Sequence, residues 1–292
     1  MELFRVDPAP FFQQLINVIA PDDAKLASTY SDSVFEFRLT LANIVLRGGY
    51  IEITLPPEVQ LPPVDPGSGQ SAPKLIGKGV VGLKSELQVS IVSNNKETGT
   101  VLRVSDLFKD GVGRLGKSTT IKFTVALLRT PLTTESTSSF KILTKDAAAR
   151  IVNFVLSDLR VTMLRGKHIP TLAVKASNYV VGASASHTFS FATPVPLERT
   201  DQIMIVYNLE SSLPIRGSRC EGGEALAAGQ SCSVTQDVLS TSSGLVFSGG
   251  RSTLEVGAKL SLTIFGAENP KTGRQTGIFT VHIKDRTGYV KA

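Results

Sequence analysis

The residues most suggestive of chemistry are residues 111–118, where Gly-Val-Gly-Arg-Leu-Gly-Lys-Ser matches the phosphate-binding pattern Gly-x-x-x-x-Gly-Lys-Ser. Such a loop holds phosphate only between a buried strand and a helix, because backbone N–H groups and the helix N-terminus bind the anion. Residues 119–125 alternate polar and apolar side chains, several of them β-branched, which predicts a strand. We therefore expect no nucleotide site here.

Other arrangements of catalytic or metal-binding residues are absent from the sequence. The three histidines, His168, His187 and His282, lie far apart and show no metal-ligand spacing. His187 and His282 fall in predicted strands, where an outward polar position explains them. Short acidic pairs lie in turns, where solvated charges are a simpler interpretation than a calcium site. The sequence thus predicts no enzyme activity, no metal and no other cofactor.

Charge and hydropathy exclude two further classes of function. The 292 residues carry a net charge of +6, but the basic residues are scattered and no aromatic residues interleave with them. Nucleic-acid binding is therefore not expected. No apolar run reaches the roughly 18 residues of a membrane-spanning helix, so no membrane span is expected. The first residues do not resemble a secretory signal, which leaves an intracellular protein, a removed signal or a signal upstream.

The two cysteines favour an extracellular or cell-surface location. Cys220 and Cys232 are close in sequence and lie in Gly-rich, polar segments where neither suits the core. A disulfide that closes a surface loop is the favoured interpretation, and it indicates an oxidising compartment. Two free, exposed thiols are the alternative.

Internal similarity predicts two copies of one β unit. The clearest match joins residues 130–142 to residues 269–281, where a Pro is followed nine positions later by a Phe and then by an alternating strand. The alignment continues upstream without a gap, so that residues 121–125 fall on residues 260–264. The same unit therefore occurs in each half of the chain.

A second match lies at the start of each half. Residues 33–37, which include two Phe, resemble residues 186–191, and residues 46–53 resemble residues 197–205. Short alternating strands separated by Gly, Pro and Ser clusters are typical of antiparallel sandwiches. The predicted fold is all-β, with two tandem antiparallel immunoglobulin-like β-sandwich domains.

The predicted domains are residues 27–165 and residues 166–292, and residues 1–26 form an apolar leader. The leader is either a strand or a short helix, and it has no counterpart in the repeat pattern. Its apolar side chains are too many to leave in solution, so they are covered either by the first domain or by a neighbouring copy. We favour the neighbouring copy and assign an assembly role to Phe11, Phe12, Leu15, Ile16, Val18 and Ile19.

The second half resembles a repeat of very large extracellular cell-surface proteins of protists such as ciliates. The resemblance is carried by residues 184–191, 201–205, 256–264 and 269–281 together with Cys220 and Cys232. The first half matches partially, because it lacks the cysteines and has Thr130 where the repeat has Asn. The resemblance implies an extracellular structural or adhesive array, such as part of a filament or coat.

The leading hypothesis is a structural protein that self-associates into a filament or array, or that binds other extracellular structural proteins. The alternative is an adhesin or carbohydrate-binding module that contacts glycans through loops at one end of a sandwich. Few loop aromatic residues support the alternative.

Overall fold

The structure is a computed structural model that describes most of the chain. Described are residues 7–19, 27–62, 75–95, 97–206, 219–223, 231–236, 243–248, 253–271, 273 and 279–292, with the backbone alone for 231–236 and 243–248. These residues contain twenty strands and no helix, so the all-β prediction is confirmed. Accordingly, no helix in this part of the chain is long and apolar enough to cross a membrane.

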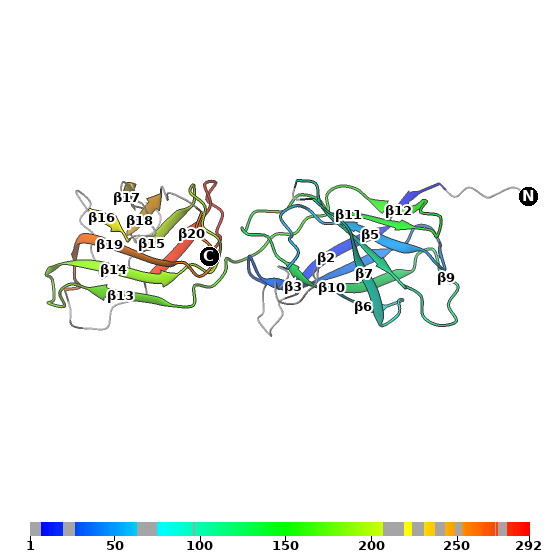
Figure 1. Ribbon diagram of the computed structural model, residues 1–292, viewed down its shortest axis with the longest axis horizontal. Helices are drawn as coiled ribbons and strands as arrows, with labels where there is room; N and C mark the ends of the chain where they lie inside the picture. Colours follow the sequence, from blue (N-terminus) through cyan, green and yellow to red (C-terminus); the bar gives the residue numbers. More distant parts are fainter. Residues whose placement is uncertain are drawn as a thin grey trace, which may run out of the picture. The chain divides into compact units, whose positions relative to one another are not determined.

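The chain divides into two compact units, Met1–Leu164 and Arg165–Ala292. The strands of the first unit are β1 (Ala9–Pro10), β2 (Gln13–Ile19), β3 (Asp32–Thr40), β4 (Val45–Leu46), β5 (Tyr50–Thr54), β6 (Ile76–Val81), β7 (Glu86–Asn95), β8 (Gly99–Ser105), β9 (Arg114–Leu115), β10 (Thr120–Arg129), β11 (Lys141–Lys145) and β12 (Ile151–Val155). Ten of them form a sheet in the order β1-β12-β11-β5-β8-β7-β6-β10-β3-β2, and β4 pairs with β9 (Figure 1).

The ten-stranded sheet of the first unit folds into two layers at β7. This strand pairs with β6 at its beginning and with β8 along most of its length. All pairs in the sheet are antiparallel except the short parallel pair of β1 with β12. Such a folded antiparallel sheet buries one face of each layer in a common core.

Aromatic side chains join the two layers of the first unit. Phe37 stacks on Phe123 with ring centroids 5.1 Å apart, and Phe35 and Phe37 lie 6.2 and 6.3 Å from Phe140 of the opposite layer. All four rings are fully buried. Burial of each contributes roughly 1.5–3 kcal/mol. The period-two alternation of β3 and β10 therefore determines which side of the sheet faces the core.

The second unit consists of two four-stranded sheets. Its strands are β13 (Leu172–Ala176), β14 (Ser184–Ala192), β15 (Gln202–Val206), β16 (Cys220–Gly222), β17 (Ser231–Gln236), β18 (Ser243–Ser248), β19 (Lys259–Glu268) and β20 (Thr280–Lys284). One sheet has the order β13-β14-β19-β16 and the other β17-β18-β15-β20. Phe189 of the first sheet packs edge-on against Phe279, with ring centroids 5.5 Å apart.

The two units share one strand order. The order β2-β3-β10-β6 of the first unit corresponds to β13-β14-β19-β16, and β7-β8-β5-β11 corresponds to β17-β18-β15-β20. A β-bulge interrupts the register of β3 with β10 and that of β14 with β19 at the same position. The repeat seen in the sequence is therefore present in the strand pairing of each unit.

Strand pairing relates β3 to β14 with an alignment that is shifted by two residues from the sequence match of residues 33–37 with residues 186–191. Phe37 lies opposite Phe123 and Phe189 lies opposite Leu262, so Phe189 corresponds to Phe37. His187, two residues earlier on β14, then corresponds to the fully buried Phe35. Both strands alternate with the same period, so a shift of two preserves the pattern and the letters alone do not reveal it.

The apolar leader is part of the repeat, whereas the sequence predicted a segment outside it. Strand β2 pairs along its whole length with β3, as β13 pairs with β14. Residues 9–19 are thus β1 and β2 of the first unit, and the strand alternative for the leader is correct. The sequence match missed the correspondence because an edge strand conserves only alternation between the two copies.

Four positions, three in tight turns and one at the β-bulge of β10 and β19, keep the same backbone conformation in both units although their residues differ. The left-handed residues with positive φ are Tyr30, Ser118, Leu127 and Ala149 in the first unit, and Gly182, Gly257, Gly266 and Gly288 in the second. Three pairs also share a hydrogen bond; for example, Ala149 N donates to Asp146 O and Gly288 N donates to Asp285 O. The fold therefore imposes these conformations whether or not glycine is present.

Candidate functional site

The segment that resembles a phosphate-binding loop lies between two strands. Within residues 111–118, Arg114 and Leu115 form β9, and β10 begins at Thr120. The amide of Ser118 donates to Leu41 O, so the loop serves as a strand connection. The expectation that a strand rather than a helix follows Lys117 is confirmed. The geometry offers no helix N-terminus to a phosphate.

His187 is buried, which corrects the predicted outward position. Its side chain fills the place that Phe35 holds in the first unit, and its Nε2 lies 3.1 Å from Asn269 Oδ1. Burial lowers the pKa of His282, and the charge of Lys284 lowers it further. His168 is exposed. No group of three metal-ligating side chains occurs among the described residues.

The two cysteines lie on strands of different sheets. Cys220 is on β16, opposite Ile264 of β19, and Cys232 is on β17, opposite Phe247 of β18. The side chain of Cys232 lies outside the described residues, so the disulfide stays a prediction. A bond between them would connect the two sheets of the second unit.

The six predicted assembly residues divide between the core and the surface: β2 alternates, and of the two residues that precede it only Phe11 is buried. Phe11 and Ile16 are buried, and Val18 packs against the same core. Three outward residues are exposed: Phe12 by 55%, Leu15 by 47% and Ile19 by 44%. Half of the group therefore stabilises its own unit, and half is available to a partner.

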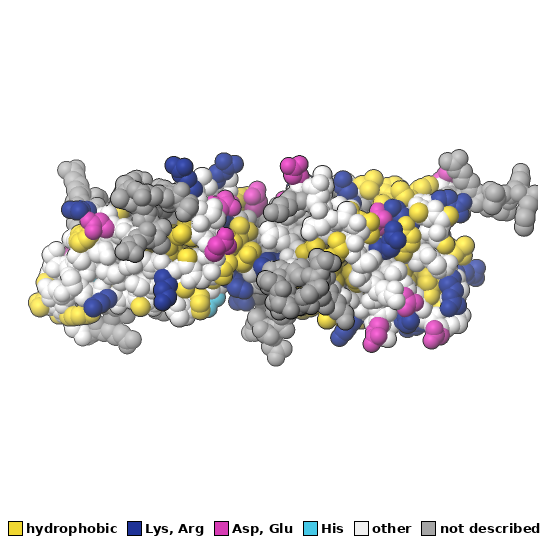
Figure 2. Space-filling model, in the orientation of Figure 1, with side chains coloured by type: hydrophobic (Ala, Val, Ile, Leu, Met, Phe, Trp, Pro, Cys, Tyr) yellow, Lys and Arg dark blue, Asp and Glu magenta, His cyan; other side chains and the backbone are white. Residues whose placement is uncertain are grey.

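These outward residues belong to a larger surface, the outer face, which is the solvent side of β2, β3, β10 and β6. Ile76 and Val81 of β6 are 45% and 49% exposed. Hydrophobic side chains are visible on the surface of the first unit, interspersed with Lys and Arg (Figure 2). Sequence reasoning missed the part on β6, because its residues Ile-Gly-Lys-Gly-Val-Val show no local pattern that assigns them to this face.

The middle of the outer face is charged. Lys122 Nζ lies 2.8 Å from Glu36 Oε2, and Asn17 Nδ2 donates to Glu36 Oε1 at 3.4 Å. Register places Arg38 beside Lys122 and Lys78 beside Thr124. With three basic side chains and one carboxylate, this region is net positive.

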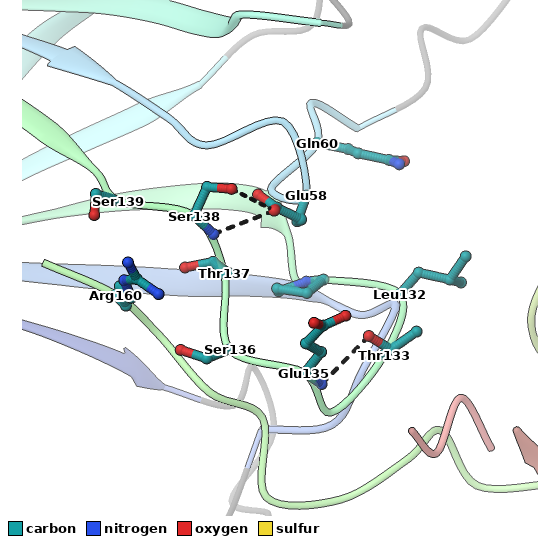
Figure 3. A pocket seen from close by; sticks show the side chains of 11 residues that line it. Glu58, Gln60, Leu132, Thr133, Glu135, Ser136, Thr137, Ser138, Ser139 and Arg160 are labelled. Carbon is teal, nitrogen blue, oxygen red and sulfur yellow. Dashed lines mark hydrogen bonds between the residues drawn. The ribbon is translucent and has the colours of Figure 1, made fainter. Parts of the chain in front are cut away.

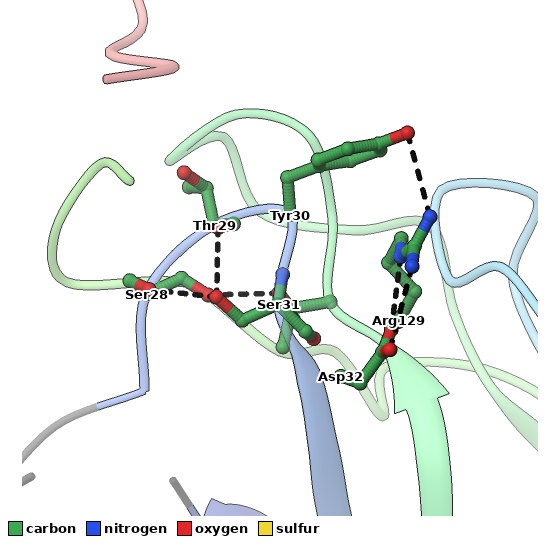
Figure 4. Close-up of polar contacts among 7 residues, drawn as sticks. Ser28, Thr29, Tyr30, Ser31, Asp32 and Arg129 are labelled. Carbon is green, nitrogen blue, oxygen red and sulfur yellow. Dashed lines mark hydrogen bonds and ion pairs between the residues drawn. The ribbon is translucent and has the colours of Figure 1, made fainter. Parts of the chain in front are cut away.

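One end of the first unit carries a polar cluster around Arg129 (Figure 4). The Arg129 guanidinium lies 4.7 Å from the centroid of the Tyr30 ring and donates from Nε to Asp32 Oδ1 at 2.9 Å. Burial lowers the pKa of Arg129, but the hydrogen bond and charge of Asp32 outweigh this and leave it raised. Thr130 Oγ1 donates to Ser28 O at 2.8 Å and so fixes the turn before β3.

Asn269 fixes the corresponding turn of the second unit, as Thr130 does in the first. Its Nδ2 donates to Asn178 O at 2.8 Å and to Val180 O at 2.9 Å. The Thr130-for-Asn difference noted in the sequence therefore replaces one turn-fixing side chain with another. Both positions serve folding, and neither points to a ligand.

A polar pocket of about 470 Å³ lies beside residues 131–139 of the first unit (Figure 3). Glu58 Oε1 accepts hydrogen bonds from the amide and hydroxyl of Ser138, at 3.2 and 2.7 Å. Gln60 and Arg160 also line the pocket, and no aromatic side chain does. The Ser- and Thr-rich residues 133–139 are thus held against a carboxylate.

Two buried polar groups were not predicted. Asn153 is fully buried; its Oδ1 accepts from the amides of Ala42 and Asn43 at 3.0 and 2.7 Å, and its Nδ2 donates to Thr144 Oγ1 at 2.7 Å. Lys291 Nζ lies 2.6 Å from Asp201 Oδ2 with both side chains buried. Burial raises the pKa of Asp201. A polar residue at an inward strand position was the available signal for Asn153.

Comparisons with known proteins give no family for this chain. No family model and no curated protein matches it. Three similar solved structures have low identity and TM-scores. They are the C-terminal domain of the Streptococcus pyogenes antigen I/II-family protein AspA (10% identity, TM-score 0.31, 95% of this chain and 96% of that chain), the type II cohesin dyad from the adaptor ScaA scaffoldin of Acetivibrio cellulolyticus (12%, 0.29, 96% and 88%) and the B domain of a biofilm associated protein (11%, 0.30, 97% and 85%). TM-scores this low support no inference about the function of this chain.

Proposed function

We propose that the chain is a non-enzymatic structural protein of the cell surface that self-associates as a protomer of a filament or coat. The main support for this proposal is the outer face of the first unit, where aliphatic side chains are exposed on an ordered sheet. Isolated exposed apolar residues are normal, but a set of them on one face marks a contact surface. The extracellular part of the proposal rests on the predicted disulfide and on the resemblance to protist surface repeats.

The edge of β2 supports association in a second way. This strand is the last in its sheet, and among the described residues it pairs with β3 alone. Exposed edges pair readily with another chain unless charge, proline or a bulge prevents it. Residues 13–19 carry no charged side chain and no proline. The strand therefore combines an open backbone edge with outward apolar side chains.

The test uses point substitutions rather than removal of residues 1–20, because that deletion would also remove Phe11 and Ile16 from the core. Negative-stain electron microscopy of the concentrated chain should show regular assemblies. The triple variant Phe12→Ser, Leu15→Ser, Ile19→Ser should remain folded and lose them. A matched control is Leu46→Ser, which alters an aliphatic residue of the same unit that is 60% exposed. A native chain that stays monomeric when concentrated would refute the proposal.

An adhesin is the second candidate, and the pocket beside residues 131–139 is the observation that favours it. Its hydroxyl, amide and carboxylate groups resemble the polar lining of a carbohydrate site. Glycan-array binding that Arg160→Ala abolishes would support this candidate. The absence of aromatic side chains from the lining makes it the weaker one.

A further inference from the structure

The second unit shows that the fold does not require an apolar outer face. At the corresponding positions its strands carry Ala173 and Lys175 on β13, Ser186 and Thr188 on β14, and Ser261 and Thr263 on β19. Arg219 and Gly223 lie where the first unit has Ile76 and Val81, and Phe265 at the position of Ala126 is the large apolar residue on this side of β19. Both units have the same strand order, so each serves as a control for the other. The exposed aliphatic residues of the first unit therefore have a purpose other than folding.

These aliphatic residues occupy the four corners of the outer face. Leu15 and Ile19 lie on the outermost strand β2, and Val81 and Ile76 lie on β6 at the opposite side. One row runs from Leu15 through Arg38 and Lys122 to Val81. The other row runs from Ile19 through Val34 and Ala126 to Ile76. We call Leu15, Ile19, Ile76 and Val81 the corner residues.

From this pattern we infer that two copies of the chain pack outer face against outer face about a twofold axis. The inference rests on the proposed self-association and names one of its contact surfaces; a twofold contact closes on a pair, so growth into an array needs a second contact, such as the edge of β2. A twofold axis in the plane of the contact, along or across the strands, places corner residues on corner residues. Such a self-complementary surface is what an isologous contact requires. The Glu36 carboxylate at the centre comes within reach of basic side chains of the second copy.

The size of the outer face predicts a weak contact. With strands about 4.8 Å apart and a rise of about 3.4 Å per residue, the corners span about 14 Å in each direction. Including side-chain margins, each copy would bury about 450 Å², or about 900 Å² in total, which is below the roughly 1,200 Å² of stable interfaces. The contact therefore forms at high local concentration, as in an array where many copies are held together.

The charges predict how salt affects this contact. Each face contributes Arg38, Lys78 and Lys122 against Glu36, so two copies bring like net charge together. Salt screens that repulsion and should strengthen the dimer. A heterologous contact with an acidic surface would instead weaken as salt increases. The sign of the salt dependence distinguishes the two modes of association.

Sedimentation equilibrium of the intact chain tests the inference with two matched substitutions. Val81→Lys places a charge at a corner on β6, away from the β2 edge. Val92→Lys alters β7 at a residue with the same 49% exposure and serves as control. We expect dimerisation that increases with salt, a loss of at least about tenfold in association constant for Val81→Lys, and no change for Val92→Lys.

Three outcomes would overturn the inference. Equal association of both variants, or association that weakens with salt, would refute the face-to-face contact and leave self-association intact. A wild-type chain that remains monomeric at every salt and protein concentration would refute the proposed function as well. The failures of the two proposals are therefore distinguishable.

Discussion

The reciprocal substitutions Ala149→Gly and Gly288→Ala test whether the two units share one turn. Both residues are in the left-handed region: φ is 63° at Ala149 and 94° at Gly288. In each turn the preceding Asp accepts two amide hydrogen bonds through Oδ1, at 2.9 Å. The two turns share this Asp and its amide hydrogen bonds, while the left-handed residue and the residues beside it differ.

The magnitude follows from two opposing terms. A left-handed conformation costs a non-glycine residue roughly 1–2 kcal/mol. Glycine in turn loses about 0.4–1 kcal/mol through the greater freedom of its unfolded chain. The net advantage of glycine is therefore about 0.5–1 kcal/mol. Ala149 is exposed, and a Cβ at Gly288 would meet no atom within 4 Å, so packing does not interfere.

Ala149→Gly should thus stabilise the first unit, and Gly288→Ala should destabilise the second by a similar amount. For units of this size, the shift in Tm is about 1–4 °C. Hydrogen exchange measured by mass spectrometry assigns each change to a unit through its own peptides. Destabilisation by Ala149→Gly, or no effect of Gly288→Ala, would contradict the common turn.

Three further predictions concern the two cysteines, Asn153 and His282. Intact-mass measurement should show Cys220 and Cys232 oxidised, and reduction should cost the second unit on the order of 3 kcal/mol; two alkylatable thiols in unreduced protein would contradict this. Asn153→Leu should destabilise the first unit by about 2–4 kcal/mol in urea unfolding, because it removes the acceptor of the buried Ala42 amide and of the part-buried Asn43 amide. An unchanged free energy of unfolding would exclude that role. Since burial lowers the pKa of His282, the unfolded chain binds the proton more readily, so the second unit should lose stability as pH falls below the ordinary value of 6.5. His282→Gln should flatten that part of the pH profile of Tm, and an unchanged slope would assign it to another group.

The strand arrangement was largely predictable because the repeat is carried by core residues. The match of residues 121–125 with residues 260–264 placed β10 and β19 correctly, since both copies need apolar side chains at the same inward positions. Edge strands were harder to recognise. β2 and β13 face one neighbour only and tolerate different side chains, so alternation alone relates them.

Surface function was less predictable than the fold. The sequence placed an apolar contact at residues 11–19, but it did not show that Phe11 and Ile16 face the core while Leu15 and Ile19 face solvent. That distinction depends on which side of β2 packs on the second layer. Ile76 joins the same face only through the pairing of β6 with β10, which no local pattern in the sequence encodes.

Sedimentation velocity of the intact, oxidised chain over a wide range of concentration shows whether the protein self-associates. We expect a sedimentation coefficient that increases with concentration, and an increase that Val81→Lys suppresses while Val92→Lys does not. A single monomer species at all concentrations, identical for the three proteins, would contradict this expectation.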